Sequence, residues 1–171
     1  MNKAVGAAAI LFSCFYSALR YLHMRSEKIL QMQALGKSLL ELRSELAERR
    51  RNLGDIFSSV AGKNGIDRIK SFYEGLHGKL CDLGERGFSE IWREEAGRCF
   101  APLGRNVEDL LSPLGEYLGG SELERQCAAL EKAAFRLEEE CQREKETLKR
   151  EKKLRLGLSL SGGAFLVIML L

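Results

Sequence analysis

The 171-residue chain carries 27 Lys and Arg against 24 Asp and Glu, so its net charge is only +3. This balance excludes the strongly basic type of nucleic-acid-binding domain, and 30% charged residues with 8% aromatics is typical of a helical protein. The five cysteines are widely spaced and form no CxxC pair, which argues against a disulfide framework or a zinc site and predicts reduced thiols facing a cytosol.

Each end of the chain contains an apolar run, because residues 4–19 and 156–171 hold no Lys, Arg, Asp or Glu. As a helix, each run is roughly 24 Å long, slightly short of the ~30 Å hydrocarbon layer of a bilayer. Arg20 and Arg155 can extend their side chains to the headgroups and cover the difference. The sequence therefore predicts an N-terminal transmembrane segment at 1–22, a cytoplasmic helical bundle domain at 23–155 and a C-terminal transmembrane segment at 156–171.

The orientation of the two segments follows from the Lys and Arg residues beside them. A cluster of cations precedes the second segment, and further cations follow the first. The predicted membrane-interface residues are Arg20, Lys149, Arg150, Lys152, Lys153 and Arg155. The body is thus predicted to face the cytoplasm, with both termini on the far side of the cell membrane.

Other interpretations of the two ends remain open. The first segment could be a cleaved signal peptide, although it lacks a clean A-x-A site and its helical pattern continues past Leu22. The stretch Leu11-Phe12-Ser13-Cys14 loosely resembles a lipoprotein box, although aromatic residues follow it. The second segment could be a buried core helix, although the nearby cations favour a membrane anchor.

The chain after the first segment has an amphipathic helical pattern. Its apolar positions recur every three or four residues, at Met32, Leu35, Leu39, Leu42 and Leu46. No proline separates this pattern from the first segment. We therefore expect one helix from the membrane to about Arg51, after which Asn52, Gly54 and Asp55 provide stop and start signals.

A second long helix is predicted from Ser121, a good N-cap residue that acidic residues follow. Its heptad-like seam consists of Leu123, Cys127, Leu130, Ala134, Leu137, Cys141 and Leu148. Two long helices that rise from one membrane with matched seams are expected to pair antiparallel. The predicted fold is therefore all-α: a helical bundle on a long antiparallel two-helix stalk, with N- and C-terminal transmembrane helices.

Three shorter apolar stripes of helical spacing lie between the long helices. They cover Ile66 to Leu83, Ile91 to Leu103 and Val107 to Leu118, and glycines punctuate them. Pro113 is expected to start or kink a turn within the last stripe. No alternating β pattern is present in the sequence, so the middle of the chain is predicted to consist of short helices.

The sequence offers little material for catalysis. Its two histidines, His23 and His77, are too few for a histidine-based triad or a metal cluster. Gly36-Lys37-Ser38 is superficially like the end of a phosphate loop, but it lies inside an amphipathic helix and position 31 is Gln. We therefore expect no enzyme activity, no cofactor, no metal, no nucleic acid and no small-molecule substrate.

One pattern is more specific than periodicity. Ile91-Trp92 precedes Leu114-Gly115-x-x-Leu118-Gly119-x-Ser121, with Glu124, Gln126 and a terminal Leu156-Gly157 further on. Together with the chain length, this pattern resembles the stage III sporulation protein AB family over nearly the whole chain. The chain departs from the family at residues 51–55, where a Thr-Pro helix start is typical and Arg51-Asn52-Leu53-Gly54-Asp55 stands instead.

The resemblance implies a function. That family is similar to the cytoplasmic helical domain of the type II secretion F protein, so this chain would be a non-enzymatic platform or adaptor subunit of the transenvelope channel between mother cell and forespore. Its implied partners are a secretion-type ATPase, the sporulation AA protein, and the membrane channel and ring proteins, besides the lipid bilayer. Its implied location is the mother-cell membrane around the forespore.

The predicted partner surface combines the tryptophan helix with the glycine-containing segment. Its residues are Trp92, Leu114, Gly115, Leu118, Gly119, Ser121 and Gln126. The alternative is that Trp92 and Leu118 are core residues, that the glycines serve helix ends, and that Ser121 is an N-cap. A generic membrane-anchored coiled-coil tether or scaffold is the competing function, and it predicts that the distal bundle is dispensable.

Overall fold

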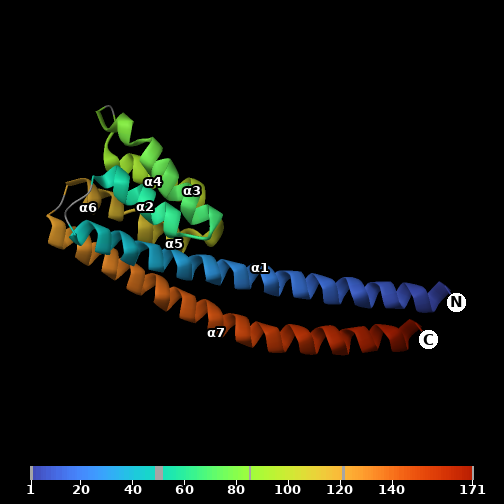
Figure 1. The fold of residues 1–171 in the computed structure, drawn as a ribbon. Helices are drawn as coiled ribbons and strands as arrows, with labels where there is room; N and C mark the ends of the chain where they lie inside the picture. The colour runs from blue at the N-terminus through green and yellow to red at the C-terminus, as the bar shows by residue number, and fades with distance from the viewer. Residues whose placement is uncertain (1, 49–51, 85, 121, 171) are drawn as a thin grey trace. The chain divides into compact units, whose positions relative to one another are not determined.

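The computed structural model describes residues 2–48, 52–84, 86–120 and 122–170; the side chains of 2–11, 14, 82, 84, 153 and 155–170 are outside the description. Figure 1 shows the elements in chain order. They are α1 (Asn2–Ala47), α2 (Leu53–Lys63), α3 (Asp67–Gly78), the 3-10 helix η1 (Leu80–Gly84), α4 (Phe88–Phe100), the 3-10 helix η2 (Ala101–Leu103), α5 (Arg105–Leu111), α6 (Leu114–Gly120) and α7 (Leu123–Leu170). No strand occurs in these described ranges, which confirms the all-α prediction.

The chain divides into two compact units. The first consists of Met1–Ile29 and Gln142–Leu171, and the second of Leu30–Cys141. Within the part of the chain that the structure describes, no helix combines the length and the apolar character that crossing a membrane requires. The proposed boundaries at 22/23 and 155/156 stay predictions.

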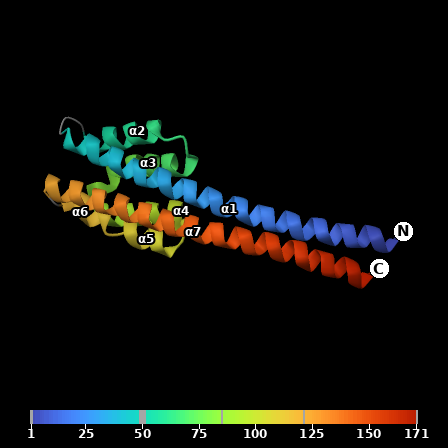
Figure 2. The same cartoon turned by 90° about the horizontal axis from the view of Figure 1, so that it is seen from below.

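The second unit is built on the facing parts of α1 and α7. They run antiparallel, because Arg43 of α1 pairs with Glu131 of α7 at 3.2 Å whereas Gly36 faces Leu137, further along α7. Figures 1 and 2 show these parts side by side, with α2 to α6 packed over one side of the pair. The predicted pairing of two seams is confirmed here: the buried seam residues are Met32, Leu35, Leu39, Leu42 and Leu46 on α1, and Leu130, Ala134, Leu137 and Cys141 on α7.

The short helices enclose an aromatic cluster. Phe72 of α3 lies at its centre, with its ring centroid 5.0 Å from those of Tyr73 and Trp92 and 4.9 Å from that of Phe100. All four of these side chains are fully buried. Each buried side chain of this size contributes roughly 1.5–3 kcal/mol by leaving water, so burial of this cluster stabilises the second unit.

One buried polar contact joins α1 to the short helices. The Ser38 hydroxyl lies 3.1 Å from the Tyr73 hydroxyl and donates a hydrogen bond to the Leu35 carbonyl at 2.8 Å. Burial raises the pKa of the Tyr73 phenol well above its usual value, so that it stays neutral. Residues 36–38, the sequence that is superficially like a phosphate loop, therefore lie within helix packing.

Two boundaries between short helices follow from single residues. The predicted third stripe is divided at Pro113, so that α5 ends at Leu111 and α6 begins at Leu114. Gly104 between η2 and α5 has a φ of 103°, a conformation that glycine adopts without strain. At the end of α1, the described helix stops at Ala47, and the predicted end near Arg51 lies outside the described residues.

Candidate interaction groove

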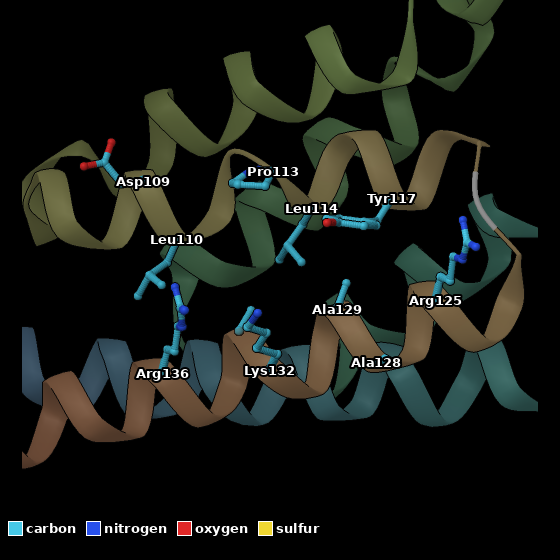
Figure 3. Close-up of a pocket in the computed structure, with 11 residues that line it drawn as sticks. Asp109, Leu110, Pro113, Leu114, Tyr117, Arg125, Ala128, Ala129, Lys132 and Arg136 are labelled. Atoms are coloured by element: carbon cyan, nitrogen blue, oxygen red, sulfur yellow. The ribbon is translucent and has the colours of Figure 1, made fainter.

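A groove runs along the second unit between α5 and α6 on one side and α7 on the other. Its volume is about 420 Å³. The residues that line it are Asp109, Leu110, Pro113, Leu114, Tyr117, Arg125, Ala128, Ala129, Lys132, Ala133 and Arg136. In Figure 3, Leu110 and Leu114 point from α5 and α6 toward α7, where Ala129 faces them.

The walls of the groove differ in charge. Arg125, Lys132 and Arg136 lie on one stripe of α7, because residues seven and eleven positions apart share a helix face, and all three side chains are exposed. The opposite wall carries Asp109, near one end, and the ring of Tyr117, which is 44% exposed. An apolar floor with cations along one edge is a suitable surface for an amphipathic partner.

The α6 wall is held in place by α4. A Cβ added at Gly115 would lie 2.9 Å from both the Ser89 Cα and the Trp92 Cβ, so only glycine allows α6 to approach α4 this closely. The Trp92 indole N–H donates to the carbonyl of Leu111 at 2.8 Å and thereby satisfies the last turn of α5. One face of α6 is thus fixed against α4, and Tyr117 on the other face of α6 lines the groove.

The end of the groove near the α6–α7 connection is also fixed. The Gln126 side-chain amide donates to the Leu118 carbonyl at 3.2 Å, which joins the first turn of α7 to α6. Gly119 lies next to Phe88, whose Cβ would be 3.2 Å from a Cβ at that position. The first contact limits how far α6 can move from α7, and the second holds α6 against α4.

The residues of the predicted partner surface do not form one exposed patch. Trp92, Leu114 and Leu118 are buried in the core, because burying these large apolar side chains is more favourable than exposing them. This burial agrees with the alternative given above for Trp92 and Leu118, and partner binding by the seven residues stays a prediction. Gly115 is buried, Gly119 is exposed and Gln126 is half-buried. Ser121 lies outside the described residues.

The predicted membrane-interface residues have exposed side chains wherever the structure describes them. These are Arg20 on α1 and Lys149, Arg150 and Lys152 on α7. The side chains of Lys153 and Arg155 lie outside the description. Contact of these residues with headgroups stays a prediction.

A buried carboxylate on α4 escaped the sequence analysis. Glu95 is 1% exposed, and it accepts hydrogen bonds from Arg98 at 2.5 Å and pairs with Lys79 at 2.8 Å. Burial alone would raise the pKa of this carboxyl, but the hydrogen bonds from Arg98 and Lys79 outweigh it, so the pKa lies below its usual value. Its position within the stripe Ile91, Trp92, Ala96, Cys99 was the available signal, because a residue at that spacing faces the core.

The paired state of Glu95 gives it a structural role. It joins α4 to Lys79 at the end of α3, and Gly75 makes room for it, since a Cβ there would lie 2.3 Å from the Glu95 carboxylate. The neighbouring Glu94 pairs with Lys79 and Arg86, and hydrogen bonds from these two residues lower the pKa of its carboxyl to about 2. Carboxylates held ionised in this way are poor general acids and bases at neutral pH.

The first unit holds a separate cluster of charges between α1 and α7. Glu144 of α7 lies 2.9 Å from Arg25 and 3.0 Å from Lys28 of α1, and Arg25 also lies 3.6 Å from Glu151. These side chains are between 23% and 29% exposed. The charges fix the register of the two helices within this unit.

A second groove lies on the α1–α7 face of the second unit. It has a volume of about 360 Å³, and among the residues that line it are Gly36, Leu40 and Phe135. Phe135 is 65% exposed. The charges at its edges are mixed, since Lys37 stands with Glu131 and Glu138, so this groove selects no single type of partner by charge.

Comparisons with known proteins give one result. No curated protein and no solved structure matches the chain. Among the described residues, no group of three or more His, Cys, Asp or Glu could hold a metal ion. The family model described as stage III sporulation protein AB matches residues 3–171. This match covers nearly the whole chain and confirms the resemblance carried by the tryptophan and glycine motifs, so the chain belongs to the stage III sporulation protein AB family, which acts in the stage III channel complex of sporulation.

Proposed function

We propose that this chain is a non-enzymatic platform or adaptor subunit of the transenvelope channel between mother cell and forespore. It links a cytoplasmic secretion-type ATPase, the sporulation AA protein, to the membrane ring and channel proteins. The observation that carries the proposal is the open groove on the second unit, which has an apolar floor and three cations along one edge. Membership of the family supports the place in the sporulation machinery.

The construction of the groove suits a subunit that transmits force. Its α6 wall rests on α4 through Gly115, and α4 in turn carries Trp92 in the aromatic cluster. A close-packed core of this kind has low compressibility. A partner that binds in the groove would therefore act on the whole second unit instead of on a mobile loop.

Membrane attachment is the second element of the proposal. The uncharged residues 4–19 and 156–171 act as the two membrane segments, with Arg20 and the cations at 149–155 at the headgroups. A reporter fused after Leu171 is expected outside the cytoplasm. A cytoplasmic signal from that fusion would rule out the two-segment arrangement.

A tether or scaffold is the alternative that one observation favours. The charge cluster of Arg25, Lys28 and Glu144 pairs α1 with α7 in the first unit, as a simple antiparallel tether would require. The two functions differ in what they demand of the second unit. Replacing the second unit by an unrelated antiparallel helical hairpin would leave a tether active and would abolish an adaptor.

The adaptor function is tested in sporulating cells. We expect the full chain, purified from membranes, to bring down the cytoplasmic ATPase, and a deletion strain to stop forming spores at the stage of the channel. Normal spore formation in the deletion strain, or membranes from which the ATPase never co-purifies with the chain, would remove the proposal.

A further inference from the structure

We propose that the groove between α5–α6 and α7 binds an acidic amphipathic helix of a partner protein. This inference rests on the proposed adaptor function and adds the chemistry of the bound segment. The bound helix presents an apolar face to the floor of the groove and carboxylates to the α7 edge. Its opposite flank, beside Asp109, is neutral or basic.

The dimensions of the groove fit a short helix. From Arg125 to Arg136, the α7 edge measures about 16 Å at 1.5 Å per residue, which corresponds to roughly three helical turns. Ala128, Ala129 and Ala133 line this stretch, and small side chains allow a second helix to approach closely. Leu110, which is half-buried, and the exposed ring of Tyr117 supply the apolar contacts on the facing wall (Figure 3).

The charges select the partner. Arg125, Lys132 and Arg136 form no ion pair among the described residues, although many other cations of the second unit do. Lys79 and Arg86, for example, each pair with a carboxylate at 2.6 Å. Within the described part of the chain, no carboxylate pairs with these exposed cations, so a partner is expected to supply the carboxylates.

Asp109 favours a helix over other anionic ligands. A membrane surface presents negative charge over its whole area, and a small anion has no apolar face for the floor. A membrane surface would bring negative charge toward the Asp109 carboxylate, and a small anion would leave Leu110 uncovered. A helix with carboxylates on one flank only satisfies both walls, and this asymmetry also fixes which way round it lies.

The proposal is tested by photocrosslinking in sporulating cells. A photoreactive benzoylphenylalanine replaces Tyr117 in the groove and, as a control, the exposed Ser58 on α2 in the full chain. We expect an adduct at Tyr117 that the Ser58 position does not form. Mass spectrometry of the adduct should map a segment of another protein with apolar residues at helical spacing and carboxylates along one flank.

Charge variants supply the second measurement. Lys132→Glu reverses a groove cation, and Lys70→Glu makes the same change at an exposed site on α3. We expect about a tenfold loss of adduct with Lys132→Glu and no loss with Lys70→Glu. Both variants should keep the wild-type helical circular dichroism, and Lys132→Arg should keep the adduct, because it retains the charge.

Several results would overturn the inference. They are an adduct with lipid, with a second copy of this chain or with a segment that lacks carboxylates, no adduct at Tyr117, and equal losses in the two charge variants. The adaptor function and the groove inference can be refuted independently of each other. If the deletion strain loses spores while Lys132→Glu forms them normally and its adduct is unchanged, the inference about the groove is wrong and the proposed function stands.

Discussion

Replacing Gly115 by alanine tests whether the glycine motif serves packing. The added methyl group would lie 2.9 Å from the Ser89 Cα and from the Trp92 Cβ. Since Ser89 presents backbone, it cannot move aside as the end of a flexible side chain could. Overpacking of this kind costs about 1–3 kcal/mol, and the better helix propensity of alanine offsets up to ~1 kcal/mol of it. We expect a net destabilisation of about 1–2 kcal/mol.

The expected loss is measurable as a change in melting temperature. For a protein of this size, 1–2 kcal/mol corresponds to a decrease of about 2–8 °C, followed by circular dichroism of the full chain in detergent. Gly62→Ala is the matched control, because a Cβ at that position of α2 meets nothing within 4 Å and should leave stability unchanged or raise it. If Gly115→Ala melts at or above the wild-type temperature, the packing argument is refuted.

Three further predictions concern the polar contacts. Glu95→Gln should destabilise the chain by about 1–3 kcal/mol at pH 7, since it weakens a buried ion pair. The pKa of Glu95 is lower in the folded chain than its usual 4.5, so its stabilisation is complete above about pH 4.5 and is lost as the pH falls through the folded value. Urea titrations should therefore show the two proteins converging in acid, and a difference that persists at low pH would contradict this account. Tyr73→Phe should cost about 1 kcal/mol in the same titration by removing the contact with Ser38, and a double-mutant cycle with Ser38→Ala should show coupling; additive effects would disprove it. Glu144→Gln should speed amide hydrogen exchange around Arg25 but not in α4. The difference from wild type should shrink in high salt, because salt screens the ion pair and wild type then also exchanges faster. Unchanged exchange near Arg25 would count against the charge cluster.

The long helices were predictable because their periodicity is strong. Every apolar position chosen on α1 between Met32 and Leu46 is buried, and the seam on α7 is buried from Leu130 to Cys141. Pro113 also marked the boundary between α5 and α6 correctly. These features depend on local sequence alone, through helical spacing and the missing N–H of proline.

The groove was not predictable in the same way. Its cations on α7 look like part of an ordinary solvated helix face, and only the position of α5 and α6 turns that face into one edge of a cleft. For Glu95, helical spacing could have placed the side chain toward the core, but it could not identify the partner Lys79, which belongs to another element. Contacts between separate segments decide the groove and the Glu95 ion pair, and periodicity does not report such contacts.

The positions of the glycine-motif residues explain why the family pattern lies next to the proposed binding groove but does not coincide with its surface. Leu114 and Leu118 turn inward, and Gly115 lets α6 lie against α4, so the residues that carry the family resemblance fix the wall of the groove. Tyr117, on the same short helix, is thereby left at the groove, opposite α7. A change at Gly115 should consequently weaken partner binding only through loss of structure, whereas a change at Lys132 should weaken binding in a chain that is still folded.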